Sequence, residues 1–129
     1  MKMTAKKIVE AYQASQELSN MVLPFKTARA VARLRKRLKV EFSTVVEMEK
    51  VIVDSCGGQT CENGYKFPGP EQTQAFQEGH RKMMEQEDEI SLPVVDLSAY
   101  ADQLRITPAA IEALEGIVIF EKEERETEG

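Results

Sequence analysis

Five basic residues near the N-terminal end of a long amphipathic segment are the clearest candidates for chemistry in this chain. They lie on the side opposite the apolar positions of the segment, and three- and four-residue steps connect them: Lys26, Arg29, Arg33, Lys36 and Arg37. On a helix this spacing places them on one face, where they could line up along an anionic partner such as a phosphate backbone. The alternative is a solvated face that nearby glutamates partly neutralise, and we favour it because no aromatic residue is interleaved for base stacking.

A metal site would have to use Cys56, Cys61 and His80. These residues supply three ligands at most, whereas a structural zinc site needs four, usually with a close Cys-x2-Cys pair. We therefore expect no metal and no cofactor. The two cysteines fit free thiols in a reducing compartment, and His80, the one histidine, is expected at the surface or edge of a helix.

No reaction signature is present in the sequence. No serine or cysteine has a visible base and orienting group, and no glycine loop precedes a helix in the form that binds phosphate. We expect that the protein is not an enzyme.

The net charge of −5 conceals a strong polarity along the chain. Residues 1–40 carry ten basic and two acidic side chains, whereas residues 41–129 carry seven basic and twenty acidic ones. An asymmetry of this kind can indicate a surface for nucleic acid. The basic and acidic side chains can also pair with each other within the protein. We expect the acidic segments 85–89 and 121–128 to neutralise part of the basic face.

The composition is that of a protein without membrane segments. The longest apolar runs have four residues, and no apolar stretch of a signal peptide follows the first residues. We expect a cytoplasmic protein that does not associate with membranes.

The first two helices are predicted to form a long antiparallel hairpin. Thr4 can cap a helix that runs to about Leu18, and a turn over residues 20–25 contains Pro24, with Leu23 and Phe25 packing around the corner. A second helix over residues 27–56 would begin with Thr27 as its cap. Two consecutive glycines, Gly57 and Gly58, would end it.

An apolar stripe runs along this second helix for more than seven turns. Its positions recur every three or four residues, and they are Val31, Leu34, Leu38, Phe42, Val45, Met48 and Ile52, with Cys56 beside them. A stripe of this length needs either an extended antiparallel partner within the chain or a second copy of the chain. We expect a second copy, because the first helix is too short to cover the stripe and the third is only thinly apolar. The sequence therefore predicts a homo-oligomer, most simply a dimer, with Arg35 and Lys39 at the edge of the stripe pairing across a helix interface.

Turn-forming residues predict the secondary structure of the middle of the chain. Asn63-Gly64 between short polar strands indicates a small β-hairpin tip. Pro70 is suited to the first position of a third helix running to about Asp88, and the alternation from Ile90 to Val94 indicates an edge strand interrupted by Pro93.

The C-terminal part is predicted to contain one short helix. Asp96 or Ser98 can cap a helical turn around Tyr100. Thr107-Pro108 begins a helix whose buried face would hold Ile111 and Leu114 and which would end at Gly116. Residues 117–120 form a strand or extend that helix. The predicted fold is thus mainly α (α+β), with a single helical domain over residues 1–120 and a charged, frayed tail over 121–129.

Several motifs in their order resemble one protein family. They are Ala-Tyr in the opening helix, Leu-Pro-Phe-Lys-Thr-Ala at 23–28, Glu-Asn-Gly-Tyr-Lys at 62–66, Ile-Ser-Leu at 90–92 and Ile-Thr-Pro-Ala-Ala-Ile-Glu-Ala-Leu-Glu at 106–115. Together they cover almost the whole chain, which resembles a family of short, uncharacterised proteins encoded by phages and prophages of Gram-positive bacteria. The resemblance implies a viral origin, a location in the cytoplasm of an infected bacterial host and a small, mainly helical fold. It implies no catalytic residue.

Three functions remain from the sequence. The first is a phage accessory protein that self-associates through the long helix and binds a phage or host protein, in virion assembly or in inhibition of host defence. The second is sequestration of a small anionic ligand such as an immune signalling nucleotide, with paired copies of Arg29 and Arg33 at an oligomer interface. The third is a factor directed to nucleic acid through the basic part of the long helix.

Overall fold

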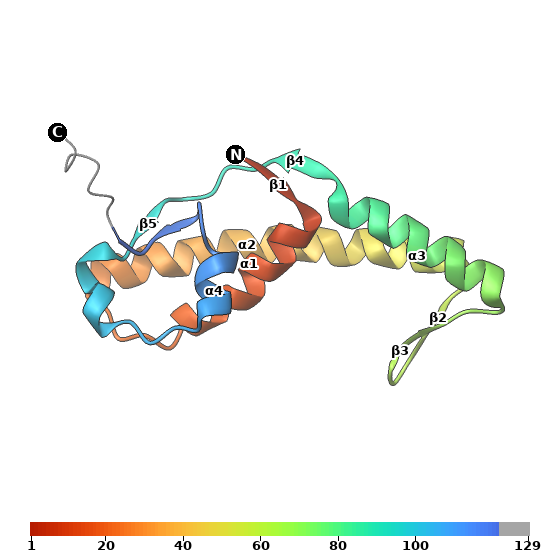
Figure 1. Cartoon of the computed structure of the whole chain (residues 1–129), viewed down its shortest axis with the longest axis horizontal. Coiled ribbons are helices and arrows are strands. Elements are labelled where there is room, and N and C mark those ends of the chain that lie inside the picture. The colour runs from red at the N-terminus through yellow and green to blue at the C-terminus, as the bar shows by residue number, and fades with distance from the viewer. Residues whose placement is uncertain (122–129) are drawn as a thin grey trace. The chain divides into compact units, whose positions relative to one another are not determined.

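The computed structural model describes residues 1–121 of the chain. Helices dominate, and short strands join them, as the sequence predicts (Figure 1). In chain order the elements are β1 (Lys2–Thr4), α1 (Ala5–Leu18), α2 (Phe25–Ser55), β2 (Gln59–Cys61), β3 (Gly64–Lys66), α3 (Pro70–Glu85), β4 (Glu87–Glu89), β5 (Val95–Asp96), the 3-10 helix η1 (Ser98–Gln103), α4 (Pro108–Ala113) and β6 (Val118–Ile119).

The chain divides into two compact units. Unit 1 comprises residues 1–9 and 40–90, and unit 2 comprises residues 10–39 and the chain from Ser91 onward. Helices α1 and α2 contribute to both. The prediction of a single domain over residues 1–120 stays a prediction, and the predicted tail lies outside the described residues except for Glu121.

Local signals determine where α1 and α2 begin and end. The hydroxyl of Thr4 accepts a hydrogen bond from the backbone N–H of Lys7 at 3.0 Å, which confirms it as the cap of α1. Helix α2 begins at Phe25, because the carbonyl of Pro24 already accepts a bond from Ala28 N–H at 2.8 Å. The prediction that Thr27 caps this helix is therefore wrong.

The C-terminal end of α2 is closed by glycine. Gly57 has a φ of +71°, which a residue with a side chain rarely adopts. The N–H of Gly58 then reaches back to the carbonyl of Val53 at 2.9 Å. This geometry satisfies a carbonyl of the last turn and ends the helix as predicted.

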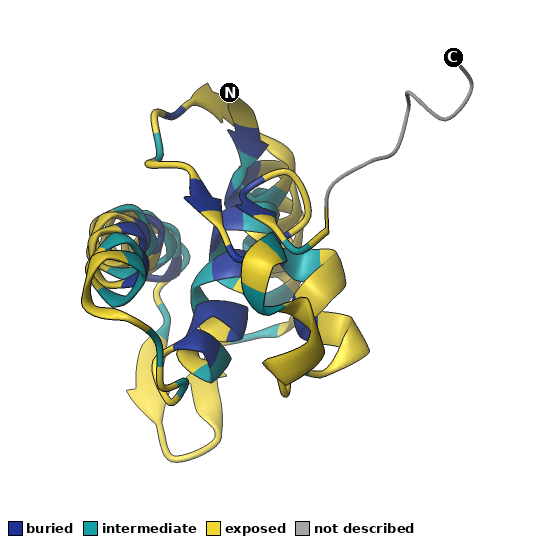
Figure 2. Ribbon diagram, turned by 90° about the vertical axis from the view of Figure 1, so that its left-hand side faces the viewer, coloured by how far each residue is buried: buried dark blue, intermediate teal, exposed yellow. Residues whose placement is uncertain are grey.

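Strands β2 and β3 form the predicted hairpin in unit 1. Cys61 pairs with Gly64, so Glu62 and Asn63 make the turn itself and Gly64 has a φ of +124°. Every strand residue is exposed, and Figure 2 shows the hairpin entirely in the colour of exposed residues.

The third helix is shorter than predicted. It begins at Pro70 but ends at Glu85, and residues 87–89 form β4 instead of its last turn. Strand β4 pairs antiparallel with β1, which the sequence analysis did not predict, and Lys2 lies opposite Glu89 in this ladder. Opposite charges facing each other across antiparallel strands favour this pairing. The core of unit 1 consists of Met3, Ala5, Ile8, Val45, Val53, Met83 and Ile90.

Two parallel strands close unit 2. Val95 of β5 pairs with Val118 of β6, so the middle two residues of the Ile117–Phe120 run form a strand. The predicted edge strand from Ile90 to Val94 is wrong: Val94 is 73% exposed and the strand begins one residue later, at the buried Val95. After Pro93 the buried positions shift by one, because proline interrupts the regular alternation.

The predicted turns of helix in unit 2 are present. Asp96 accepts a hydrogen bond from the N–H of Ser98 at 2.9 Å at the start of η1. Thr107 caps α4 by accepting a bond from Ala110 N–H at 3.2 Å. Leu114 is buried as expected, but Ile111 is 40% exposed and Ala110 takes its place inside. The core of unit 2 consists of Ala11, Ala14, Ser15, Leu18, Val31, Leu34, Leu38, Val95, Leu97, Ala110, Leu114, Ile117 and Val118.

Candidate partner-binding surface

All five basic candidates lie on one exposed side of α2. We call this surface the basic face; it consists of Lys26, Arg29, Arg33, Lys36 and Arg37, each of which is exposed. The opposite side of the same turns carries Val31, Leu34 and Leu38, which are at most 4% exposed. Because a helix rises 1.5 Å per residue, the face extends for about 16 Å along the axis. The spacing in the sequence predicted this arrangement correctly.

The positive charge of this face has few partners. Between Phe25 and Lys39 the helix carries seven basic residues and no acidic one. Within residues 1–121, Lys26, Arg29, Arg33 and Lys36 form no ion pair or hydrogen bond through their side chains, whereas Arg37 does have an interaction. The described part of unit 2 therefore leaves most of this charge exposed to solvent.

The neutralisation of the basic face by acidic segments stays a prediction. Residues 85–89 belong to unit 1, where Glu85 accepts a bond from Arg81 at 2.8 Å. Residues 122–128 lie outside the described part of the chain, so whether they neutralise the face stays a prediction.

Arg35 lies next to the basic face but has a structural task. Its Nε donates to the hydroxyl of Ser15 at 3.4 Å. Ser15 is fully buried and its hydroxyl donates to the carbonyl of Tyr12 at 2.6 Å. Arg35 thus joins α2 to α1 across a helix interface within one chain.

The apolar stripe of α2 belongs largely to the core of the chain itself. Val31, Leu34, Leu38 and Val45 are buried, and the remaining three candidates for an oligomer interface are half-buried: Phe42, Met48 and Ile52. In unit 1 the second half of α2 is met closely by α3, since a Cβ on Gly79 would lie 3.2 Å from Ile52 Cγ2. The chain therefore covers four of these seven positions itself. The assignment of the stripe to an oligomer interface stays a prediction, as does self-association.

Two apolar side chains are strongly exposed just before the basic face. Val22 is 98% exposed and Phe25 is 79% exposed. The expectation that Phe25 packs around the corner between the helices is wrong, because Phe25 is the first residue of α2 and its side chain lies outside the core. Sequence reasoning missed this exposed pair because apolar residues beside a turn usually pack inward.

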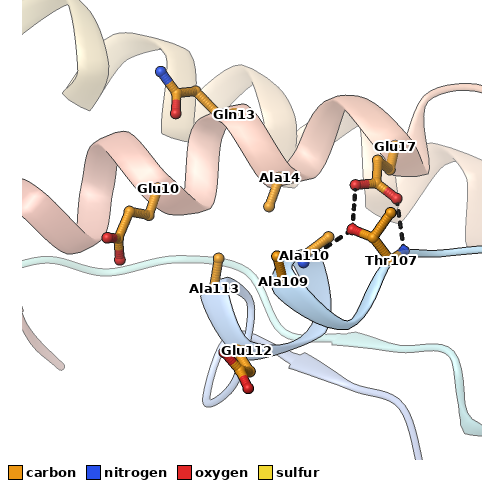
Figure 3. Close-up of a pocket in the computed structure, with 9 residues that line it drawn as sticks. All are labelled: Glu10, Gln13, Ala14, Glu17, Thr107, Ala109, Ala110, Glu112 and Ala113. Atoms are coloured by element: carbon orange, nitrogen blue, oxygen red, sulfur yellow. Dashed lines mark hydrogen bonds between the residues drawn. The ribbon is translucent and has the colours of Figure 1, made fainter.

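A concave region of unit 2 lies between α1 and α4. It has a volume of about 480 Å³ and is lined by Glu10, Gln13, Ala14, Glu17, Thr107, Ala109, Ala110, Glu112 and Ala113 (Figure 3). Glu17 is already engaged, because it accepts bonds from both the N–H and the hydroxyl of Thr107. In Figure 3 the side chains of Gln13 and Glu112 point away from the alanines. Its glutamates give this region the opposite charge to the basic face.

His80 in unit 1 has a partner that the sequence did not reveal. Its Nε2 lies 3.3 Å from Glu49 Oε1, and Tyr65 donates to the other oxygen of Glu49 at 3.4 Å. Burial, followed by the charge of Glu49 and the hydrogen bond to it, raises the pKa of Tyr65. The His80 ring also lies 5.4 Å from the ring of Phe76. The cluster joins β3 and α3 to α2, and residues so far apart in the chain could not be paired from the sequence.

The described residues show neither a metal cluster nor a membrane helix. Within residues 1–121 no group of three or more His, Cys, Asp or Glu residues is placed to hold a metal ion, and Cys56 and Cys61 are free thiols. No helix in this part of the chain has the length and apolar character needed to cross a membrane.

Comparison with known proteins finds no match: no family model, curated protein or solved structure is similar to this chain. The function must therefore be argued from the surfaces described above.

Proposed function

We propose that the protein is a non-enzymatic interaction protein that binds an acidic surface of another protein through the basic face of α2. The observation that carries the proposal is the set of exposed cations, four of which have no partner within the described residues. Charges held on one rigid helix are positioned in advance, so binding costs little reorganisation. Arginine can also bind carboxylates through two parallel hydrogen bonds.

A protein partner suits this surface better than nucleic acid. Interfaces between proteins are enriched in arginine and aromatic residues, and the basic face begins beside the exposed Phe25. No aromatic residue lies between Lys26 and Arg37 to stack on bases.

In this proposal the protein is the phage accessory factor that the motif resemblance suggests, and its partner is a phage or host protein in the infected cell. Sequestration of a small anionic ligand would require copies of Arg29 and Arg33 to face each other at an oligomer interface. Leu34 and Leu38 are buried within the chain and so do not themselves support that interface.

Charge reversal tests the proposal directly. The probe is a fluorescent acidic peptide with alternating glutamate and leucine, and its affinity for the full chain is measured by anisotropy at about 150 mM salt. Arg29→Glu with Arg33→Glu should weaken binding about tenfold or more. The matched control is Lys6→Glu with Lys50→Glu, which changes the net charge equally at two exposed positions outside the face and should cause a much smaller loss.

Two results would contradict the proposal. One is a peptide affinity that falls equally in the two double variants. The other is tight, salt-sensitive binding of a random-sequence DNA duplex that only the face variant abolishes. The second result would establish a nucleic-acid-directed protein instead.

A further inference from the structure

The chain contains two asparagines, and they differ in the residue that follows. Asn63 precedes Gly64, whereas Asn20 precedes Met21. The backbone nitrogen after an asparagine can attack the side-chain amide carbon, because the two atoms close a five-membered ring. Glycine has no side chain to shield its nitrogen. The pair Asn63-Gly64 therefore has the composition that favours this reaction.

The pair lies at the tip of the hairpin, where water reaches it. Glu62 and Asn63 form the turn, Cys61 pairs with Gly64, and every residue over 59–66 is exposed (Figure 2). Within the described chain the side chain of Asn63 makes no hydrogen bond, so its amide is free to rotate. Apart from the adjoining residues, no atom lies within 4 Å of the place where a Cβ on Gly64 would be. Only the hairpin itself restrains the reacting groups.

The hairpin has little support. Strands β2 and β3 have three residues each and pair only with each other, and a hairpin of this kind is marginally stable by itself. Tyr65 attaches it to the helices of unit 1: its hydroxyl donates to Glu49 at 3.4 Å, and its ring lies 5.8 Å from the ring of Phe76. The pairing of Cys61 with Gly64 restrains the backbone nitrogen of Gly64, and local opening of the tip releases it. Unit 1 need not unfold for this to happen.

Asn20 is also exposed, but its surroundings oppose the reaction. The N–H of Met21 donates to the carbonyl of Leu18 at 3.3 Å in the turn after α1. The side chain of Met21 is half-buried and stands beside the nitrogen that would have to attack. The folded chain therefore contains its own control for the pair at the hairpin tip.

We propose that Asn63-Gly64 is a site of spontaneous covalent modification in the folded protein, at which Asn63 becomes aspartate or isoaspartate. Hydroxide removes the proton from the Gly64 nitrogen, and this nitrogen bonds to Asn63 Cγ. The bond from Cγ to Nδ2 breaks, and the nitrogen takes up a proton and leaves as ammonia. Water then opens the cyclic imide. Attack at Cγ gives aspartate, and attack at the backbone carbonyl carbon gives isoaspartate; one water is consumed for each ammonia released.

Either product changes the hairpin. Both add a carboxylate beside Glu62. In isoaspartate the backbone runs through the former side chain and gains one methylene, so Cys61 and Gly64 can no longer pair in the same register. Tyr65 follows Gly64 directly, and its hydrogen bond to Glu49 depends on that register. The isoaspartate form should therefore hold the hairpin less firmly against α2.

The test follows both asparagines in the full chain at mildly alkaline pH. Samples are taken over several weeks, digested with trypsin and analysed by liquid chromatography and mass spectrometry. Trypsin releases the fragments 51–66 and 8–26, each of which contains one asparagine. Fragment 51–66 should accumulate two products of equal mass in which OH replaces one NH2 group. Its rate should exceed that of fragment 8–26 by about tenfold or more.

Three variants test the route of the reaction. Asn63→Gln keeps an amide but would have to close a larger ring, so the products should disappear. Tyr65→Phe removes the bond to Glu49 and should raise the rate about twofold or more, because the tip opens more readily. Tyr100→Phe is the matched control: it removes a tyrosine hydroxyl that bonds to Thr27 in unit 2, and the rate at Asn63 should stay unchanged.

Three results would overturn the inference. The first is equal rates at Asn63 and Asn20. The second is a fragment 51–66 that stays unchanged in the folded protein but reacts as a free peptide, since the hairpin would then protect its tip. The third is a rate that does not respond to Tyr65→Phe, which would exclude opening of the tip as the step that frees the nitrogen.

Discussion

Glu17 accepts two hydrogen bonds from Thr107, a residue 90 positions away in the chain. The backbone N–H of Thr107 donates to one carboxylate oxygen at 2.9 Å, and its hydroxyl donates to the other at 2.7 Å. The same hydroxyl accepts from Ala110 N–H and so caps α4. One carboxylate of α1 therefore fixes the start of the C-terminal helix.

This contact should make part of the stability dependent on pH. The backbone bond first, and the hydroxyl bond second, lower the pKa of Glu17. A lowered pKa in the folded state contributes stability that is present above the ordinary value of about 4.3 and is lost as the pH falls below it. Glu17→Ala should therefore be less stable than the natural protein in urea at pH 7, and the difference should shrink at pH 3.

Glu10→Ala provides the control for this measurement, because Glu10 lies on the same helix and makes no such bond within the described residues. A difference for Glu17→Ala that is the same at both pH values would show that the carboxylate does not act through its charged form.

The bond between Thr27 and Tyr100 should appear as a coupling energy. Thr27→Val and Tyr100→Phe each remove one hydroxyl, and each should cost about 0.5–1.5 kcal/mol. The double variant should cost less than the two losses added together, because both remove the same interaction. Urea unfolding of the four proteins measures this. Thr44→Val, whose hydroxyl bonds only within α2 at 3.3 Å, is the control and should not couple to Tyr100→Phe.

Leu38 should be essential for folding of the single chain. It is fully buried, and Leu38→Ala should cost about 2–5 kcal/mol by leaving a cavity. Val40→Ala, at a position that is 51% exposed, should stay within about 0.5 kcal/mol. Circular dichroism and light scattering should show loss of helix and of thermal stability in Leu38→Ala. A change from dimer to monomer with unaltered helicity would instead return the stripe to its predicted role as an oligomer interface.

Removing residues 121–129 should strengthen the attraction of anions to the basic face. These residues carry five glutamates against Lys122 and Arg125. Negative charges attached to the chain compete with an external anion for a cationic surface. The truncated protein should elute from heparin at higher salt than the full chain. Glu62→Gln with Glu71→Gln and Glu115→Gln removes a similar net charge at exposed positions. Equal shifts in the two proteins would show that the tail acts through net charge alone.

The starts of α1, α3 and α4 were among the most predictable features of the fold, whereas the start of α2 and the end of α3 were not. Thr4, Pro70 and Thr107 act through hydrogen bonds or backbone geometry within a few residues. Their roles can therefore be predicted from the adjacent sequence. Strands β1 and β4 could not be predicted in this way. Each has three residues and neither shows an apolar alternation, so their pairing depends on segments that meet only in the folded chain.

The candidate site was predicted in outline but not in its surroundings. The periodic spacing of Arg29 and Arg33 identified the exposed face correctly. The period of Leu34 and Leu38 also identified buried positions, but a period cannot say what covers them, and the sequence analysis assigned them to a second copy of the chain. The exposure of Phe25 depends on where α2 begins after the turn, which no local pattern indicates.

The pairing of β1 with β4 has a consequence for synthesis of the protein. Residues 2–4 leave the ribosome well before their pairing partners, residues 87–89. At about 5–20 residues per second, the intervening chain takes about 4–17 seconds to make. During that interval the apolar side chains of Met3 and Ile8 lack two other residues of the unit 1 core, Met83 and Ile90. Unit 1 can therefore complete its core only after residue 90 has been made, because residues 1–9 and 40–90 contribute to it together.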